Sequence, residues 1–334
     1  MLNLDNKEQK MSIIGDIQKP VKGHIDQFEV VFRDAIRSKV SLLDLIMRYL
    51  TRRKGKQIRP LFVFLSAELS GGVTDSSHRA AAMIELLHTA TLVHDDVVDD
   101  SNERRGAFSI NALWKNKIAV LAGDYLLSRG LLLAVENKEF RLLQIVSAAT
   151  REMSEGELLQ IEKARRLDIK EEIYYEIIRK KTAVLIAACC AAGAASAGAS
   201  EEQIANMYKF GELVGMAFQV KDDLFDYHKS NLIGKPNGID IREQKMTLPL
   251  IFTLNNVDSS TKSKIINTVK NHNKDRARVD EVIEIVHKNG GLEYAHQRMI
   301  QFASEAKTLL SQYQDSDVKN ALFSLVDYVI SRDK

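Results

Sequence analysis

Two short stretches of the chain carry three aspartates each in the same spacing, D-D-x-x-D. Their members are Asp95, Asp96 and Asp99 in the first group and Asp222, Asp223 and Asp226 in the second. Each group ends a segment that is otherwise apolar. If these segments are helices, the first and last aspartates of a group lie on one face, with Cβ atoms about 5–6 Å apart. Like charges at that spacing destabilise an isolated helix, so we expect a cation to offset them.

Carboxylate oxygens without other ligands suit Mg²⁺, a hard cation that keeps several waters and usually bridges protein carboxylates to substrate phosphates. Zinc is disfavoured because no set of His and Cys has ligand spacing. The two cysteines, Cys189 and Cys190, are adjacent, which excludes a disulfide framework and favours a reducing, cytoplasmic setting. The aspartates therefore predict metal-bridged binding of a diphosphate. The competing interpretation is a pair of solvated acidic helix ends.

Basic residues near both groups could complete such a site. They are Lys56, Arg59, Arg104, Arg105, Lys181, Lys235 and Lys245. Lys181 and Thr182 are expected to begin a helix, whose free N–H groups and positive dipole end would attract anions. Taken singly, each of these charges is more typical of a solvated surface. Together they would supply enough cationic charge for two diphosphates.

Helices must position these residues. There are four prolines, none between Pro60 and Pro236, and Leu, Ala, Glu, Lys and Met are abundant. The apolar periodicity predicts helices over residues 22–50, 58–70, 75–100, 109–137, 139–164, 170–198, 201–229, 239–255, 259–271, 276–288, 291–312 and 316–332. The chain is thus expected to be all-α, a single-domain bundle of helices over residues 21–334, preceded by a flexible N-terminal arm over residues 1–20.

The composition is that of a globular protein, with 334 residues, 45% of them hydrophobic and 28% charged. The net charge of +2 gives no global field that would recruit nucleic acid or an anionic membrane. The first twenty residues lack the apolar stretch of a signal peptide. The uncharged run over residues 182–200 has the length of a membrane helix, but its small residues favour a helix buried by its neighbours. We therefore expect no transmembrane span.

Six motifs occur in a fixed order between residues 55 and 251: GKQIRP, ELLHTATLVHDDVVDDSNERRG, GELLQ, KKTAVL, GMAFQVKDDLFDY and GKPNGIDIREQKMTLPLI. They resemble those of the trans-isoprenyl diphosphate synthases, also called polyprenyl synthetases, of the medium- or long-chain type. The resemblance implies the isoprenoid synthase fold, about ten or more helices around a central apolar cavity, and a homodimer. One departure is Gln244, where the family more usually has glycine before the lysine. We expect it to stiffen that loop without removing a ligand.

The resemblance also implies the reaction, a Mg²⁺-dependent head-to-tail condensation of isopentenyl diphosphate with an allylic diphosphate. Asp95 and Asp99 would bind two Mg²⁺ and Asp222 a third, with Mn²⁺ as a possible substitute. The ions would neutralise the leaving diphosphate together with Arg104, Lys181 and Lys235. The double bond of isopentenyl diphosphate then attacks the allylic cation, and loss of a proton leaves a trans alkene.

The family pattern assigns the remaining site residues. Isopentenyl diphosphate, bound without metal, would contact Lys56, Arg59, His88 and Arg105. The allylic diphosphate would contact Arg104, Lys181, Thr182, Gln219 and Lys235. Asp96 and Asp223 complete the expected catalytic set. His94 is expected to be structural, and Phe218 and Tyr227 are more typical of core than of cation stabilisation through their rings.

Product length is expected to depend on the residues just before Asp95. In the family, bulky aromatics four and five residues before that aspartate limit the product to about C15–C20. Here these positions hold Thr91 and Ala90, which are small, and Leu87 lies one turn further back. Weaker floor candidates are Leu131, Leu132 and Val146. We therefore predict a product of about C30–C45, a precursor of quinone side chains.

Several alternatives remain open at this point. A shorter-chain synthase making geranylgeranyl or farnesyl diphosphate would share every motif. A terpene cyclase or head-to-head synthase shares acidic helices but lacks the GKQIRP segment. A partner subunit of a heteromeric synthase would commonly have lost aspartates, and a helical binding or scaffold protein would not turn over substrate. The sequence fixes neither the allylic primer, the exact product nor the dimer interface.

Overall fold

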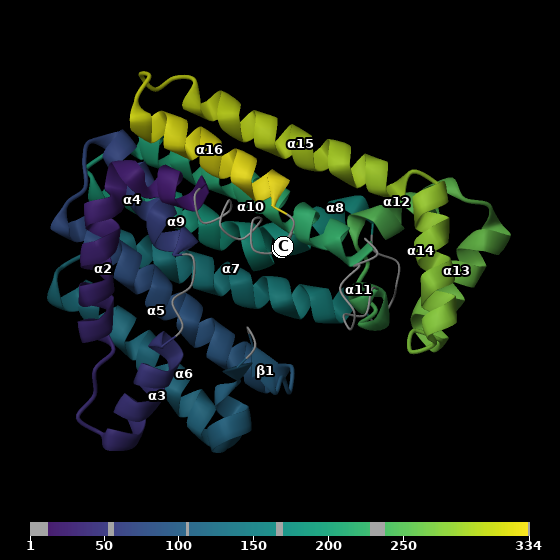
Figure 1. The fold of residues 1–334 in the computed structure, drawn as a ribbon, viewed down its shortest axis with the longest axis horizontal. Coiled ribbons are helices and arrows are strands. Elements are labelled where there is room, and N and C mark those ends of the chain that lie inside the picture. The colour runs from purple at the N-terminus through teal and green to yellow at the C-terminus, as the bar shows by residue number, and fades with distance from the viewer. Residues whose placement is uncertain (1–12, 53–56, 105–106, 165–169, 228–237, 333–334) are drawn as a thin grey trace, which may run out of the picture. The chain divides into compact units, whose positions relative to one another are not determined.

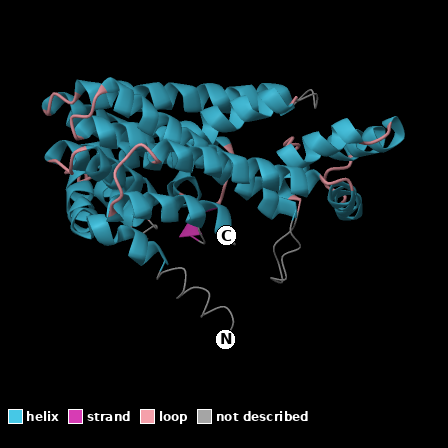
Figure 2. Ribbon diagram, turned by 90° about the horizontal axis from the view of Figure 1, so that it is seen from above, coloured by secondary structure: helices cyan, strands magenta, loops and turns pink. Residues whose placement is uncertain are grey.

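The computed structural model describes residues 13–52, 57–104, 107–164, 170–227 and 238–332. Nearly every element in these ranges is a helix (Figure 2). The exception is one antiparallel pair of two-residue strands, β1 (Glu103–Arg104) and β2 (Ala107–Phe108). The all-α prediction is therefore confirmed. The chain divides into two compact units, the first made of residues 1–150, 188–208 and 313–322, the second of residues 151–187, 209–312 and 323–334.

In the first unit, two long antiparallel helices form the framework. Its N-terminal elements are η1 (Lys19–Val21), α2 (Lys22–Ala35), α3 (Ser41–Thr51), α4 (Ile58–Ser70), α5 (Asp75–Val98) and α6 (Ile110–Glu136). Helix α5 packs along α6 and also contacts α2 and α4, while α3 contacts α6 (Figure 1). A capping box begins α5, in which Thr74 and Ser77 bond each other's side chains and backbone N–H groups. Helix α5 is thus held at its start and along its length, and it ends at the first aspartate group.

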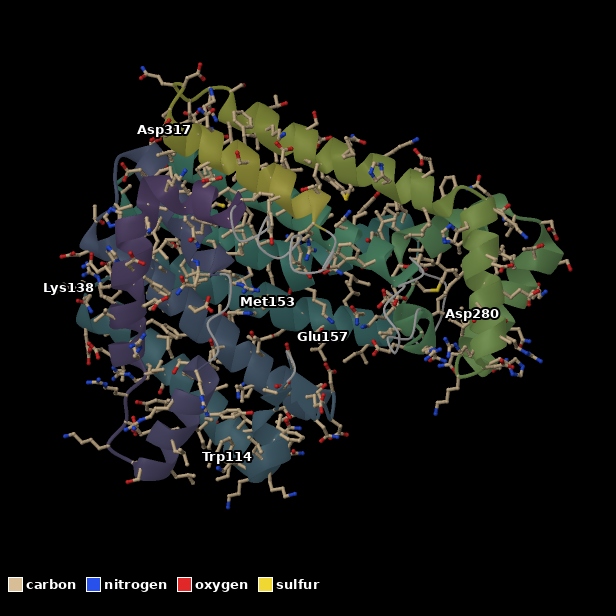
Figure 3. The ribbon with its side chains drawn as sticks, viewed as in Figure 1. Trp114, Lys138, Met153, Glu157, Asp280 and Asp317 are labelled. Atoms are coloured by element: carbon tan, nitrogen blue, oxygen red, sulfur yellow. The ribbon has the colours of Figure 1, made fainter. Side chains whose placement is uncertain are left out.

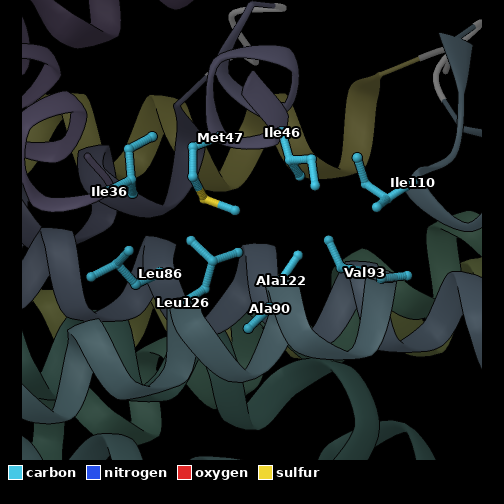
Figure 4. Close-up of a cluster of buried hydrophobic side chains, with 10 residues drawn as sticks. Ile36, Ile46, Met47, Leu86, Ala90, Val93, Ile110, Ala122 and Leu126 are labelled. Carbon is cyan, nitrogen blue, oxygen red and sulfur yellow. The ribbon is translucent and has the colours of Figure 1, made fainter. Parts of the chain in front are cut away.

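A buried apolar cluster joins α5 to its neighbours (Figure 4). Its members are Ile36, Ile46, Met47, Leu86, Ala90, Val93, Ile110, Ala119, Ala122 and Leu126. The alanines on facing turns of α5 and α6 let the two helices pack closely, and the larger side chains from α3 cover the seam. Burying a residue such as Leu86 stabilises the fold by about 1.5–3 kcal/mol. The cluster therefore fixes the position of the helix that carries the first aspartates.

The second unit is organised around α12. The elements that lie wholly within it are α8 (Glu171–Ile178), η2 (Arg179–Ala183), α11 (Ile239–Arg242), α12 (Leu248–Asn256), α13 (Ser259–Asn271), α14 (Arg276–Lys288) and α15 (Gly291–Leu310). Helix α12 packs against α8, α14 and α15. Four helices have residues in both units: α7 (Phe140–Ala164), α9 (Val184–Ser196), α10 (Glu201–Tyr227) and α16 (Asp317–Ser331).

Two helices expected from the sequence are each split in the structure. The expected helix over residues 22–50 breaks into α2 and α3, because the Ser38 side chain accepts the Val40 N–H and supplies a local alternative to the helix. The expected helix over residues 239–255 breaks at Gln244, whose φ of 58° is left-handed. Pro249 in the first turn of α12 then starts a new helix. The expected helix over residues 109–137 corresponds to α6 but is kinked at Lys115, whose φ of 72° is not helical. The other expected helices match the structure within a few residues.

The uncharged run over residues 182–200 contributes α9, whose residues are buried, as predicted. Gly193 lies so close to the α4 backbone at Val63 that a Cβ there would overlap the Val63 carbonyl. Of the helices in the described ranges, α6 alone is long and apolar enough to cross a membrane by length and composition, with 28% of that window buried.

The expected N-terminal arm differs from the structure over part of its length. Residues 13–18 are helical, and Ile17 is 2% exposed, so this segment packs as helix rather than forming a flexible arm. Its apolar spacing of three to four residues continues that of the following turns. Residues 1–12 lie outside the described residues, and the domain limits of 21–334 stay a prediction.

A single π-helical turn, η2, connects α8 to α9 directly. Two glycines hold it closely. A Cβ at Gly156 of α7 would lie 2.8 Å from Lys180 Cβ, and one at Gly215 of α10 would overlap Ala183. Such π turns are rare and often occur at functional sites. The close approach of α7 and α10 therefore shapes the segment that carries Lys181 and Thr182.

Replacing Gly215→Ala is expected to destabilise the protein by about 1–3 kcal/mol, because the added methyl must push the π turn away from α10. Gly23→Ala is the matched control, since Gly23 lies on an exposed turn of α2 with no atom within 4 Å of an added Cβ. That change should stabilise by up to about 1 kcal/mol. Urea unfolding of both variants measures the difference; equal stabilities would show that the close packing at Gly215 does not matter.

Candidate active site

The first aspartate group closes α5. Asp95 and Asp99 are exposed and lie one helical turn apart, as predicted, whereas Asp96 is 4% exposed and turns inward. The helix ends here because Asp100 has a left-handed φ of 47°. The two exposed carboxylates are thus presented on one rigid helix end with room for water around them.

Asp96 lines a cavity of about 650 Å³ in the first unit, together with His88 and Gln57. His88 is 7% exposed and lies two turns before Asp95 on α5. Gln57 has a left-handed φ of 52° and donates a hydrogen bond from Nε2 to Glu29 Oε1 at 3.1 Å. Arg59 lies half-buried in the first turn of α4. The cavity has aromatic and charged walls, so it offers both apolar contact and polar partners to a ligand.

Four of the basic residues expected to bind the diphosphates fall wholly or partly outside the described residues. Lys56, Arg105 and Lys235 lie outside the described residues, and so does the side chain of Arg104. Their roles stay predictions. His94, expected to be structural, packs on Gly123 of α6 and lies 3.3 Å from the Val120 carbonyl through Nε2. Its position explains why α6 carries a glycine there.

The second aspartate group repeats the spacing of the first but not its environment. On α10, Asp222 is half-buried, Asp223 is 5% exposed and Asp226 is half-buried. Each of the three makes a different set of contacts within the second unit. The sequence spacing alone did not distinguish them, because it reports only which helix face a residue occupies.

Asp223 is held by two neutral donors. The Tyr174 hydroxyl donates to Asp223 Oδ2 at 2.7 Å, and Gln219 Nε2 donates to Oδ1 at 2.8 Å. Thr182 Oγ1 in turn donates to Gln219 Oε1 at 2.7 Å. Thr182 and Gln219, both expected in the allylic subsite, are therefore brought together, and Tyr174 joins them.

Asp226 organises the next loop. Its two carboxylate oxygens accept the backbone N–H groups of Ile239 and Asp240, at 2.8 and 2.9 Å, and its carbonyl accepts that of Gly238 at 3.1 Å. Asp226 thus caps the N-terminus of α11. Its carboxylate is committed to backbone positioning rather than to a metal ion.

Asp222 faces the C-terminal segment of the chain. Arg332 Nη2 donates to Asp222 Oδ1 at 2.6 Å and to the Phe218 carbonyl at 3.2 Å. The guanidinium lies 3.8 Å from the centre of the Phe218 ring, a cation–π contact. Sequence reasoning missed Arg332, because no local spacing connects a residue at the end of the chain to the second aspartate group.

Burial and mutual repulsion leave this region rich in carboxyl groups that resist ionisation. Burial raises the pKa of Asp222 and Asp226, and with repulsion from Asp240 raises that of Asp223 to about 7. Burial and repulsion from Asp226 raise the pKa of Asp240 to about 6. A bound cation would favour the ionised forms of these groups. A divalent ion at the second group would therefore relieve the electrostatic cost of these carboxyl groups.

The expected helix start at Lys181 and Thr182 is wrong. Helix α8, the π turn η2 and α9 follow one another without a break, and the Val184 N–H bonds to the Arg179 carbonyl. No set of free N–H groups is exposed at Lys181, so an anion there would rely on the side chain. Lys181 Nζ lies 2.5 Å from Glu157 Oε2, on α7 (Figure 3).

Two further residues singled out in the sequence, Tyr227 and Gln244, make structural contacts. Tyr227 is fully buried and its hydroxyl lies 2.7 Å from Thr247 Oγ1, which agrees with a core role. Gln244 adopts a left-handed conformation that favours glycine, and its Nε2 donates to the Val269 and Lys270 carbonyls at the end of α13. These bonds offset the backbone strain and tie the loop to α13, consistent with the expected stiffening.

These carboxylates fit Mg²⁺ better than a metal with an all-protein cage. Among the described residues, no three His, Cys, Asp or Glu side chains lie close enough to hold a metal ion together. Mg²⁺ needs only one or two carboxylates, because waters and substrate phosphates complete its octahedron. Asp95, Asp99 and Asp222 are sufficiently accessible to serve in that way.

Comparison with known proteins gives a consistent result. The polyprenyl synthetase family model matches residues 40–286. An all-trans-nonaprenyl-diphosphate synthase (geranyl-diphosphate specific) of Rhodobacter capsulatus is 35% identical over 320 residues, 95% of this chain and 97% of that protein. A short chain isoprenyl diphosphate synthase of Methanothermobacter thermautotrophicus is 37% identical over 284 residues, 84% and 87% of the two chains.

One solved structure is similar along nearly its full length. The crystal structure of a polyprenyl synthase from Caulobacter crescentus, complexed with calcium and isoprenyl diphosphate, has a TM-score of 0.87 and 32% identity. The similarity covers 96% of this chain and 98% of that one. The expected all-α fold thus has a close counterpart among solved structures.

Replacing Arg332→Gln is expected to destabilise the metal-free protein by about 1–3 kcal/mol, because Asp222 loses its charged partner. Added Mg²⁺ should then raise the melting temperature more in the variant than in the wild type, since the ion no longer competes with the guanidinium. Lys307→Gln is the control: it removes the more exposed ion pair of Lys307 with Asp327 and should barely change either quantity. An equal Mg²⁺ response in all three proteins would contradict the competition.

Proposed function

Because the chain belongs to the polyprenyl synthetase family, we propose that it condenses isopentenyl diphosphate head-to-tail onto an allylic diphosphate. The product is an all-trans polyprenyl diphosphate. The observation that carries this proposal is the surplus of buried carboxyl groups around Asp222, combined with two accessible carboxylates at the end of α5. Such groups are suited to binding hydrated divalent ions and, through them, a diphosphate.

In the proposed site, Asp95 and Asp99 hold two Mg²⁺ and Asp222 holds a third. Bound Mg²⁺ supplies positive charge that neutralises the leaving diphosphate and so lowers the barrier to C–O cleavage. The Arg332 guanidinium bonds to Asp222 Oδ1. For Asp222 to bind an ion, Arg332 must therefore move away or share the carboxylate with the ion. The released Arg332 would remain near enough to offer its charge to the diphosphate.

The second substrate needs a site without metal. Isopentenyl diphosphate is assigned to Lys56, Arg59, His88 and Arg105. Of these, His88 lines the 650 Å³ cavity of the first unit, and Gln57 of the GKQIRP segment lines the same cavity. Lys181, Arg104 and Lys235 are assigned to the allylic diphosphate. Lys181 would exchange its ion pair with Glu157 for one with the substrate.

The product length is proposed to be about C30–C45, for quinone side chains. Leu87, Thr91 and Asp95 lie at four-residue intervals, so they form one stripe of α5 that leads from the aspartates toward the start of the helix. Leu87 is 4% exposed and Thr91 half-buried. A nonaprenyl-diphosphate synthase and a short chain synthase are both similar to this chain, and the small Thr91 on the stripe favours the longer product.

Ala90 plays a smaller part in this proposal than the sequence suggested. Its side chain is fully buried in the cluster between α5 and α6, where a larger residue would disturb the packing directly. Leu131 and Leu132, considered as floor residues, are 52% and 46% exposed. Thr91 is therefore the better residue with which to block a growing chain.

A second copy of the chain is proposed to cover the exposed apolar side chains of α6. They are Leu113, Val120, Leu121, Leu131, Leu132 and Val135. A surface of this kind on a helix fits an isologous homodimer interface better than solvent. The reducing cytoplasmic setting inferred from the two buried free thiols completes the proposal.

The purified chain should elongate a C10 or C15 allylic diphosphate with isopentenyl diphosphate and Mg²⁺, and EDTA should stop it. Asp95→Asn and Asp222→Asn are each expected to lower kcat at least about 100-fold, because each removes a metal ligand. Asp100→Asn is the control, since Asp100 is exposed beside the first group and asparagine tolerates its left-handed backbone. A normal rate in either ligand variant would overturn the role given to that aspartate.

Thr91→Phe is expected to shorten the product to about C15–C20, because the ring fills the path along α5. Ile300→Phe is the control, because it adds the same ring at an exposed position of α15, and it should leave product length unchanged. Mass spectrometry of the products measures both. A wild-type product of C20 or less would favour the shorter-chain alternative, and an unchanged product in Thr91→Phe would refute the path.

A further inference from the structure

A chain of hydrogen bonds crosses the second unit from α8 to the π turn. It runs from the Tyr174 hydroxyl to Asp223, and from Thr182 through Gln219 to the same carboxylate. Tyr174 is 3% exposed and Asp223 is 5% exposed, so water is largely excluded from the central bond. These residues line a cavity of about 130 Å³ that also includes Lys181 and Lys245. These hydrogen bonds therefore determine which groups on one wall of this cavity act as donors and which as acceptors.

Asp223 fixes which way the Gln219 amide faces. An amide has a donor end and an acceptor end. With Nε2 directed at Asp223, its Oε1 must face Thr182, as observed at 2.7 Å. The reversed amide would place its carbonyl oxygen against the carboxylate, and two acceptors repel. The carboxylate thus selects one of two orientations that would otherwise fit the same space.

The amide in turn fixes the Thr182 hydroxyl. Its single proton is donated to Gln219, so the remaining lone pairs are available toward the cavity. Oxygen lone pairs attract a carbon that is acquiring positive charge and repel a diphosphate oxygen. The hydrogen-bond directions therefore disfavour the diphosphate contact expected for Thr182 and favour contact with the hydrocarbon end of the allylic substrate, where charge develops when the C–O bond breaks.

We propose that Tyr174 is a positioning residue for this wall: its hydroxyl anchors Asp223 and thereby orients the Gln219 amide and the Thr182 hydroxyl toward the developing allylic cation. The inference rests on the proposed function. In this proposal Tyr174 acts through Asp223 and needs no contact with either substrate. Because the phenol is buried beside a carboxyl group, which raises its pKa well above the usual value, it remains a donor throughout the working pH range.

The test compares Tyr174→Phe with Tyr175→Phe. The neighbouring Tyr175 hydroxyl bonds Glu171 and Arg298 instead, so its removal matches the loss of a tyrosine hydroxyl on the same helix. Tyr174→Phe is expected to lower kcat about tenfold and to leave the KM for isopentenyl diphosphate unchanged within about twofold. Tyr175→Phe should leave both constants unchanged. A purely structural role would lower the melting temperature without changing kcat of the folded fraction.

The pathway through Asp223 is tested by combining substitutions. If Tyr174 acts through that carboxylate, Tyr174→Phe should change kcat less than about twofold in an Asp223→Ala background, because alanine leaves neither Tyr174 nor Gln219 an acceptor at that position. Independent, multiplying effects would overturn the proposal. So would a normal kcat for Tyr174→Phe.

A second variant covers the case in which Tyr174→Phe does not fold. Gln219→Glu replaces the donor to Asp223 with a second acceptor but still accepts from Thr182, so the orientation that Asp223 selects is lost and kcat must fall. An unchanged kcat would overturn the inference. The proposed function fails separately: in that case the wild-type chain itself would not elongate an allylic diphosphate.

Discussion

The structure of the second unit depends on carboxyl groups that are removed from water with little positive charge to balance them. Burial raises the pKa of Asp222, Asp223, Asp226 and Asp240, and repulsion from nearby carboxylates adds to this at Asp223, Asp226 and Asp240. The three aspartates of the second group are stabilised by different partners. Asp223 uses neutral donors, Asp226 uses backbone N–H groups, and Asp222 uses a guanidinium from the end of the chain. In the proposed function, it is the guanidinium at Asp222 that gives way to a metal ion.

This difference explains how one repeated spacing can serve positioning and binding at once. In the first group, Asp95 and Asp99 are exposed, whereas Asp96 turns into a cavity with His88. In the second group, Asp223 and Asp226 bond to neighbouring side chains and backbone and so position the residues around Asp222. The glycines at 156 and 215 complete the support, because their missing side chains let α7 and α10 approach the π turn that carries Lys181 and Thr182.

Much of the fold was predictable from local pattern, since long apolar periods without proline leave helix as the consistent outcome. The predictions failed where one residue outweighed the pattern: the Ser38 turn, the left-handed Gln244, and the continuous backbone at Lys181. In the site, sequence spacing found the aspartates but not their separate roles. Tyr174 and Arg332 gave no local signal, because each reaches Asp223 or Asp222 only through tertiary packing. The shared family motifs supplied the reaction class, which spacing alone would have left open.

The central claim is that both aspartate groups act on a single diphosphate through divalent ions. The most direct measurement is a crystal structure of the chain with Mn²⁺ and pyrophosphate, with manganese located by its anomalous scattering. The account predicts manganese at Asp95 and Asp99 and at Asp222, all bound to oxygens of one pyrophosphate, with Arg332 displaced from Asp222. Manganese at only one group, or separate pyrophosphates at the two groups with no shared ion, would contradict it.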